Sequence, residues 1–164
     1  MAALKLVLPF LLAAPLLAQS GPFGNWTLVS APDLPKVIEE ATASMNFVVR
    51  PIARGRLKKT NDAYKRIQIN RTGAEISIQY DERKPQHMPG NGQAVAWKRE
   101  DGEDFLISAR LEHEDLIQTY KAEDGERSNV FHLDPKTGTL TVAVTIKSGK
   151  LPKPLTYTLT YKAG

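Results

Sequence analysis

The side chains that can carry out chemistry are spread singly along this sequence. Its histidines, His87, His113 and His132, have no spacing typical of a metal or haem site, and it contains no cysteine. The sequence also lacks the fingerprints of a nucleophile elbow, a phosphate-binding loop and a dinucleotide-binding turn. Adjacent carboxylates such as Glu39 and Glu40 occur on many charged surfaces. We therefore expect no catalytic residue, no metal and no cofactor, and we favour a binding protein over an enzyme.

The amino-terminal residues indicate a removable export signal. Lys5 precedes an apolar run, residues 6–18, which is shorter than the ~20 residues needed to span a bilayer. Small residues follow, so cleavage after Ala18 or Ser20 is predicted. We expect residues 1–20 to be a signal peptide and the protein to be exported, either periplasmic or secreted. The absence of cysteine favours a bacterial periplasm over a secretory pathway that forms disulfides.

Composition and charge fit one soluble domain over residues 21–164. The full chain has 164 residues, of which 41% are hydrophobic and 24% charged, so it can bury a core without disulfides. Its formal charge of +4 is a mild excess that suits an anionic surface such as lipid headgroups. Nucleic-acid binding would require clustered arginine with stacking aromatics, so we expect no nucleic-acid partner and a monomer.

The first predicted elements are a strand and a helical segment. Alternation over Gly24–Ser30 predicts the strand, and Asp33 can cap a helix that follows it. Pro51 interrupts the helical pattern, so two helices or one kinked helix should cover residues 33–59. The apolar stripe of this segment, at spacings of three and four, consists of Leu34, Ile38, Ala41, Met45, Val48 and Ile52.

Beyond the helical segment, apolar residues recur at every second position in short runs separated by turns. This pattern predicts an antiparallel meander, which with the first strand makes nine strands, and residues 81–92 are assigned to a loop. The predicted strands after the helices contain Ile67 and Ile69, then Ile76, Ile78 and Tyr80, and then cover Ala94–Lys98, Phe105–Leu111, Leu116–Lys121, Asn129–Leu133, Leu140–Ile146 and Leu155–Tyr161.

Unequal strand faces indicate how this meander is arranged. In the last strand Tyr157, Leu159 and Tyr161 share one side, and the threonines between them take the other. Apolar sides that all face inward must be enclosed, because an open edge recruits other chains. The fold expected is all-β with a small helical insert: an antiparallel up-and-down barrel of about 8 to 10 strands, with a helix-kink-helix lid between strands 1 and 2.

This layout resembles the calycin group, meaning lipocalins and especially fatty-acid-binding proteins. The Gly-x-Trp motif that begins their first strand is Gly24-Asn25-Trp26 here. The stretches Lys65–Tyr80 and Leu116–Gly125 and the ending Thr160–Ala163 are also similar to those proteins. The resemblance covers nearly all of residues 21–164 and implies a barrel that holds a small hydrophobic molecule. It departs from the family pattern in one strand, where residues 81–92 stand.

Ligand contacts follow from the resemblance by position. The family commonly grips a carboxylate with an arginine two residues before the last-strand tyrosine, where this chain has Leu159 before Tyr161. This difference favours a neutral or weakly polar ligand. Among the expected inward residues, Gln118, Tyr120, His132 and Tyr161 could orient a ligand, or could simply be satisfied within a filled core. The full expected set is Phe105, Ile107, Leu116, Gln118, Tyr120, His132, Tyr157, Leu159 and Tyr161.

A basic helical face is the second candidate site. Arg50, Arg54 and Lys58 are four residues apart, so they project from one side of a helix. On a lid they could make transient contact with an anionic membrane, although a merely solvated face has the same pattern.

The sequence therefore favours an exported lipid-binding and transport protein that acts without covalent chemistry. Two alternatives stay open. One is an exported interaction or envelope protein whose barrel is solid. The other is a barrel-fold isomerase that uses Tyr120 and His132.

Overall fold

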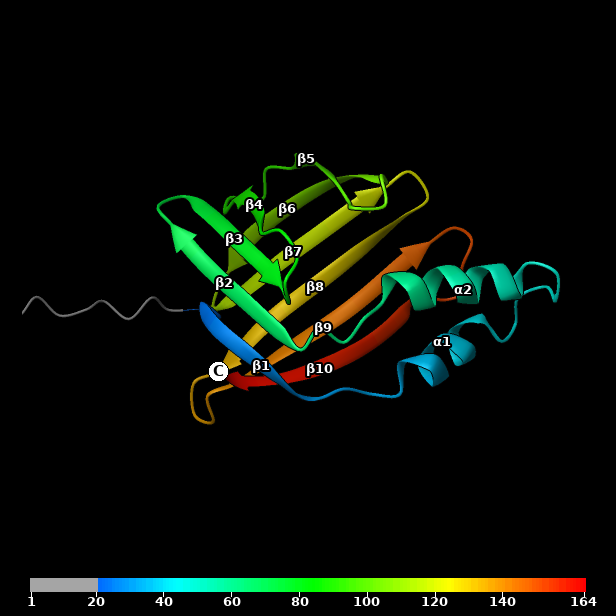
Figure 1. The fold of residues 1–164 in the computed structure, drawn as a ribbon, viewed down its shortest axis with the longest axis horizontal. Coiled ribbons are helices and arrows are strands. Elements are labelled where there is room, and N and C mark those ends of the chain that lie inside the picture. The colour runs from blue at the N-terminus through cyan, green and yellow to red at the C-terminus, as the bar shows by residue number, and fades with distance from the viewer. Residues whose placement is uncertain (1–20) are drawn as a thin grey trace, which may run out of the picture.

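The computed structural model describes residues 21–164, so the predicted signal peptide lies outside the described part. Ten antiparallel strands form a nearly closed barrel, and two helices lie together at one end of it (Figure 1). This confirms the predicted fold class, including the position of both helices between the first two strands. The elements are β1 Gly24–Ser30, α1 Leu34–Thr42, α2 Arg50–Thr60, β2 Arg66–Thr72, β3 Glu75–Tyr80, β4 Gln86–Pro89, β5 Val95–Lys98, β6 Asp104–Glu112, β7 Asp115–Ala122, β8 Gly125–Asp134, β9 Thr139–Ser148 and β10 Leu155–Ala163.

Sheet topology is that of a meander closed through its first strand. Strands after β1 pair with their neighbours in sequence, except β4 with β5, and β1 pairs with both β2 and β10. The break between β4 and β5 is bridged toward β6, because the amide of Gly92 donates to the carbonyl of Ala109 at 2.8 Å. Among residues 21–164, neither helix is long and apolar enough to cross a membrane.

The strand β4 corrects the prediction of a loop over residues 81–92. Gln86 and Met88 point into the barrel and are buried, and β4 pairs with β3. Its bounding prolines, Pro85 and Pro89, suggested a loop, but a short strand with one unpaired edge tolerates proline at its ends. The expected number of nine strands was therefore one too few.

The helical segment consists of two separate helices, which is one of the two arrangements that the sequence left open. The carboxylate of Asp33 accepts from the amide of Lys36 at 3.2 Å and caps α1. The break falls at residues 43–49, and Pro51 occupies the first turn of α2, where its missing amide costs nothing. The predicted apolar stripe holds only in α1, because Val48 and Ile52 are 61% and 65% exposed.

The barrel interior is filled at the end away from the helices. Strand register stacks apolar side chains there in layers, with Phe131 paired to Leu116 on one side and Val142 on the other. The alternation predicted for the last strand is confirmed, since Tyr157 and Leu159 are buried and Thr158 is exposed. Side chains of this filled end include Trp26, Ile69, Ile76, Ile78, Ala109, Leu116, Phe131, Leu140, Val142, Leu159 and Tyr161.

Candidate ligand-binding cavity

A cavity of about 690 Å³ occupies the barrel end beneath α2. Its wall consists of side chains from α2, β3 to β9 and the loops beside the helices. The volume lies in the range of cavities that hold small ligands. A solid barrel, one of the alternatives left open by the sequence, therefore does not describe this interior.

Aromatic rings form much of the cavity wall. Trp97 lies 5.8 Å from Phe105 and 5.9 Å from Tyr120 between ring centroids, and Tyr64 lies 4.6 Å from Tyr80. All five rings line the cavity. Large apolar rings release water when a hydrophobic ligand covers them, so this wall favours an apolar body.

An arginine reaches into the cavity from β8. Strand register sets Arg127 directly opposite Tyr120 on β7 and Ile146 on β9. Its Nε donates to Asn129 Oδ1 at 2.9 Å, while its terminal nitrogens make only longer bonds of 3.3 to 3.4 Å. Those longer bonds go to the Thr60 carbonyl, Asn61 Oδ1 and the Tyr157 hydroxyl.

The surroundings of Arg127 hold no counter-charge. In residues 21–164 its hydrogen-bond partners are all uncharged, and no ion pair includes it. A guanidinium remains protonated at any physiological pH, so the cavity contains a fixed positive charge. Burial acts to lower the pKa of Arg127, whereas the neighbouring tyrosines, Tyr157 above all, act to raise it. The net shift of this pKa is upward.

A hydrogen-bonded cluster connects Arg127 to β4. Asn129 donates to Gln118 Oε1 at 3.1 Å, and the hydroxyl of Tyr80 donates to the same oxygen at 2.5 Å. Gln118 in turn donates to Gln86 Oε1 at 2.8 Å, and Tyr120 donates to that oxygen at 2.7 Å. Every fully buried polar side-chain atom of the described residues has a partner, so this cluster is compatible with its burial.

The tyrosines of the interior are held in their neutral form. Burial raises the pKa of Tyr120 to about 12 and raises the pKa of Tyr80 well above its ordinary value. Burial likewise raises the pKa values of Tyr157 and Tyr161. These hydroxyls therefore keep their proton for donation in a hydrogen bond and do not act as bases at neutral pH.

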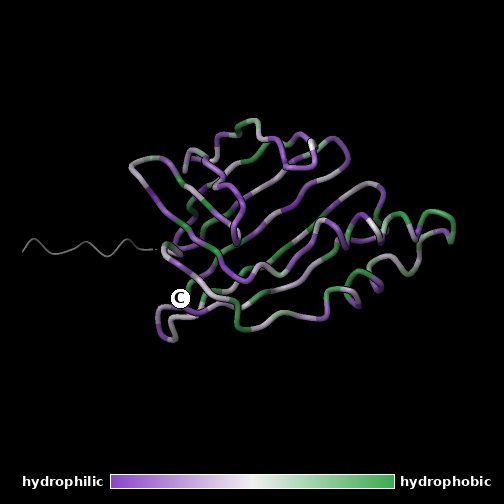
Figure 2. The backbone as a smooth tube through the Cα atoms, in the orientation of Figure 1, coloured by the Kyte–Doolittle hydropathy of each residue, from purple (hydrophilic) through white to green (hydrophobic). Residues whose placement is uncertain are grey.

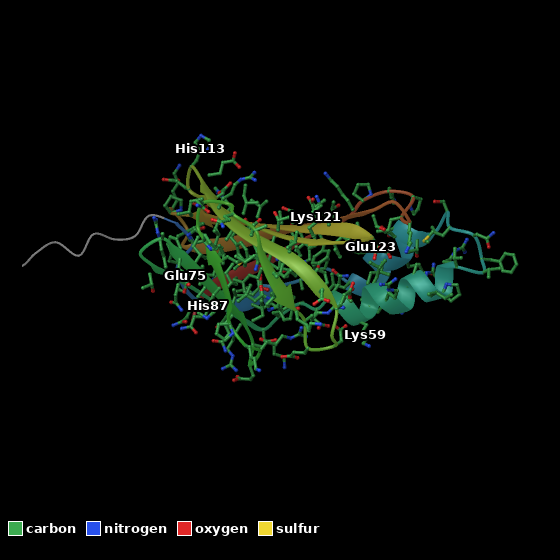
Figure 3. The ribbon with its side chains drawn as sticks, turned by 90° about the horizontal axis from the view of Figure 1, so that it is seen from above. Lys59, Glu75, His87, His113, Lys121 and Glu123 are labelled. Carbon is green, nitrogen blue, oxygen red and sulfur yellow. The ribbon has the colours of Figure 1, made fainter. Side chains whose placement is uncertain are left out.

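Opposite charges flank the cavity mouth. Arg56 and Lys59 of α2 belong to its lining, and so do Asp101 and Asp124, in the turns after β5 and β7. A hydrogen bond from Arg99 lowers the pKa of Asp101 to about 2, so this carboxylate is ionised at physiological pH. Figure 3 shows Lys59 and Glu123 toward the helical end of the barrel and His113 at the opposite end.

The sequence-predicted contacts divide between the cavity and the filled end. Phe105 and Tyr120 line the cavity, and the Tyr157 hydroxyl accepts a hydrogen bond from Arg127, which also lines it. Gln118 belongs to the polar cluster beneath the cavity. The remaining predicted apolar or aromatic contacts, buried in the barrel interior outside the cavity lining, are Ile107, Leu116, Leu159 and Tyr161.

The prediction that His132 points inward is wrong. Its side chain is 54% exposed, and its Nδ1 lies 2.6 Å from Asp115 Oδ1 on the outer surface. Alternation along β8 puts Asn129 and Phe131 inside, so the residue after Phe131 must face outward. The pairing of Tyr120 with His132 that an isomerase would have used is therefore not formed.

Sequence reasoning missed two interior residues, Arg127 and Gln86. The predicted strand began at Asn129, whereas β8 begins at Gly125, so the alternation was not extended back to Arg127. Extending it from Phe131 by four residues would have identified this arginine. The expectation of a neutral ligand rested on position 159, and the interior cation comes instead from β8. Gln86 was missed because its segment was assigned to a loop.

The predicted basic face of the lid is only partly available to a partner. Both Nε and Nη2 of Arg50 donate to the carbonyl of Met45, at 3.1 and 2.6 Å. Arg54 donates to Thr42 Oγ1 at 3.0 Å and lies 3.5 Å from Glu39 Oε1. Arg54 therefore fastens α2 to α1, Arg50 binds the segment between the two helices, and Lys58 is exposed.

Comparison with known proteins identifies the fold. No protein-family model and no curated protein match this sequence. The solved REP1-NXSQ fatty acid transporter is similar, with a TM-score of 0.56 and 15% sequence identity, covering 87% of this chain and 95% of the transporter. A point mutant of that transporter gives a TM-score of 0.53 at 16% identity, covering 87% of this chain and 97% of its own. A point mutant of the fluorescent protein UnaG gives a TM-score of 0.54 at 14% sequence identity, covering 87% of this chain and 95% of the UnaG chain. The chain therefore has the calycin-type barrel fold found in fatty-acid-binding proteins.

Proposed function

We propose that this chain is a non-enzymatic binding protein that encloses a small hydrophobic acid, with the acid group at Arg127 and the apolar body against the aromatic wall. The observation that carries the proposal is a charged guanidinium that lines an apolar cavity without a carboxylate partner. A charge in such a position is costly unless it is paired, and a ligand carboxylate would pair it. One of the similar solved structures is a fatty acid transporter, which agrees with this ligand class.

Nothing in the polar cluster favours a reaction. Among the described residues, the hydrogen-bonded groups around Arg127 are amides, hydroxyls and a backbone carbonyl, without a carboxylate or imidazole that could accept a proton. Because its tyrosines are neutral, the cluster can orient a ligand but has no general base.

The decisive measurement compares hexadecanoic acid with hexadecanol by titration calorimetry. In the wild type the acid should bind about 10- to 100-fold more tightly, because a hydrogen bond to a charged group contributes about 1.5–3 kcal/mol. Arg127→Gln should remove this preference, and Arg127→Lys should restore part of it. Arg71→Gln, on the outer face of β2, is the matched control and should leave both affinities unchanged.

A purely structural role for Arg127 predicts a different result. Its bonds to Thr60 and Asn61 hold the end of α2, where a cation is also favourable for the helix dipole. If that is its only role, Arg127→Gln lowers stability while the acid and the alcohol keep their wild-type affinity ratio. Equal binding of acid and alcohol by the wild type would likewise contradict the proposal.

We also propose that the lid makes transient contact with an anionic membrane surface through an apolar tip, defined as Phe47, Val48, Val49 and Ile52. These side chains are exposed, Phe47 by 79%. They belong to the segment between the two helices and the first turn of α2, and the backbone that joins the helices is coloured as hydrophobic in part in Figure 2. The adjoining α2 carries five cations and no acidic residue. Apolar side chains beside a cationic helix suit insertion at an anionic lipid interface.

Vesicle sedimentation tests this contact. Binding to vesicles rich in phosphatidylglycerol should exceed binding to phosphatidylcholine vesicles, should weaken with added salt, and should be lost in the double variant Phe47→Ser, Ile52→Ser. Leu106→Ser is the matched control, because Leu106 is 50% exposed on the barrel wall away from the tip. Sedimentation of the double variant equal to that of the control would contradict the proposal.

A further inference from the structure

The direction of every hydrogen bond in the interior cluster follows from Arg127. A guanidinium can only donate, so the atom of Asn129 that faces Arg127 Nε at 2.9 Å must be the oxygen. The amide nitrogen of Asn129 then faces Gln118, and its partner there must be the Gln118 oxygen, at 3.1 Å. Arg127 thus fixes which end of each of these two amides is the oxygen.

The same logic fixes Gln86. The oxygen of Gln118 already accepts from Asn129 and Tyr80, so the nitrogen of Gln118 must face Gln86. The Gln86 atom that accepts this hydrogen bond, at 2.8 Å, is therefore the oxygen. That oxygen also accepts from Tyr120 at 2.7 Å. Among residues 21–164 the Nε2 group of Gln86 donates no hydrogen bond, and since every fully buried polar atom there has a partner, this group is open to the cavity that Gln86 lines.

Around Arg127 and Gln86, the described residues therefore present two donor groups that are not fully hydrogen-bonded. One is the terminal part of the Arg127 guanidinium, whose protein bonds are all 3.3 Å or longer. The other is the Gln86 amide. Tyr120 connects them, because it lies opposite Arg127 in the β7–β8 pairing and its hydroxyl donates to Gln86.

We propose that the ligand carries a second oxygen acceptor, a hydroxyl or oxo group within a few carbons of its carboxylate, and that Gln86 selects for it. This inference rests on the proposed function, because it assumes that the acid group lies at Arg127. A plain fatty acid fills the guanidinium but leaves the Gln86 amide facing methylene groups, where a polar donor without a partner is unfavourable. An oxygenated acid satisfies both donors.

Calorimetry with hexadecanoic acid and its alpha-hydroxy and beta-hydroxy derivatives tests the proposal. In the wild type at least one hydroxy acid should bind about 5- to 10-fold more tightly than the plain acid, which corresponds to one hydrogen bond. Gln86→Met should bring this ratio to about one by removing the amide. Gln79→Met, the same change on the neighbouring strand β3 at an outward position beside Tyr80, is the matched control and should keep the wild-type ratio.

A second variant guards against loss of folding. Gln86→Glu keeps oxygens that can accept from Gln118 and Tyr120 but cannot donate at neutral pH while ionised, so it should also lose the preference for the hydroxy acid. Equal wild-type affinities for plain and hydroxy acids, or a ratio unchanged in both Gln86 variants, would overturn the inference while leaving an acid-binding protein. Failure of every acid to bind would overturn the proposed function and this inference together.

Discussion

The hydroxyl of Tyr157 on β10 lies 3.4 Å from Nη2 of Arg127 on β8, although β9 runs between the two strands. The same hydroxyl donates to Asn61 Oδ1 at 3.1 Å, just beyond the end of α2. One phenol therefore connects two strands and the lid at the position where we place the ligand's acid group. Segments far apart in sequence supply each component, so this site exists only in the folded barrel.

Replacing Tyr157 with phenylalanine should weaken both the barrel and the site. The change removes the donor to Asn61 and the acceptor for Arg127, so we expect about 1 kcal/mol less stability and a several-fold loss of hexadecanoic acid affinity. Tyr161→Phe is the control, because the Tyr161 hydroxyl donates to the Tyr64 carbonyl at 3.0 Å and does not touch Arg127. Urea unfolding and calorimetry of both variants check this. A similar affinity loss in the two variants would show that Tyr157 acts only through stability.

Alternation of residue types was sufficient to predict the barrel. Apolar side chains at every second position indicate a strand with one buried face. The predicted buried face is the observed one in the strands from Ile67 to Tyr161, except in β8. The error there had a local cause: with His132 taken as inward, the buried position was shifted by one residue from Phe131. A shift of one residue exchanges the inside of a strand for its outside, which is why His132 was predicted to face inward. Arg127 was missed because the predicted strand began two residues after it.

The site itself was less predictable because it depends on long-range pairing. Nothing local connects Gln86 with Gln118 or Tyr80 with Asn129, and only the closed register brings them within hydrogen-bond distance. The helical lid shows a related limit. Periodic apolar residues predicted burial of Ile52, but α2 has no fully buried side chain, since an amphipathic pattern does not specify whether a surface lies opposite it.

The filled and hollow ends of the barrel should respond differently to the same truncation. Phe131→Ala removes a ring that is 0% exposed and packed on all sides, so a loss of about 3–5 kcal/mol in unfolding free energy is expected. Phe105→Ala removes a ring that already borders empty space, and it should cost less while changing ligand affinity. Urea unfolding of the two variants makes the comparison. Equal losses of stability would contradict the division of the barrel into two ends.

Export remains a prediction that can be checked directly on the expressed protein. Synthesised with residues 1–20 in a bacterium that has a periplasm, the chain should be recovered from the periplasmic fraction. Intact mass and amino-terminal sequencing should then place the first residue at Gln19 or Gly21, following cleavage after Ala18 or Ser20. Recovery of the uncleaved chain in the cytoplasm would contradict the prediction. Replacing Leu11 with arginine, which interrupts the apolar run, should block processing in the same assay.

Alkaline pH should destabilise the protein before its tyrosines ionise in the native state. Tyr120 has a native pKa of about 12, against about 10 in an unfolded chain, so above about pH 10 the unfolded state releases its proton first. The unfolded state then binds fewer protons than the native state, and the unfolding free energy falls with pH by up to about 1.4 kcal/mol per unit for one such tyrosine. The raised pKa values of Tyr80, Tyr157 and Tyr161 act in the same direction.

Urea unfolding from about pH 9 to about pH 12 should show this fall in the unfolding free energy. Tyr120→Phe should make the fall shallower, and it should lower stability at neutral pH because the bond to Gln86 is lost. Tyrosinate absorbance of the folded protein with all midpoints near 10 would contradict the burial of these tyrosines, and with it the absence of a general base from the polar cluster.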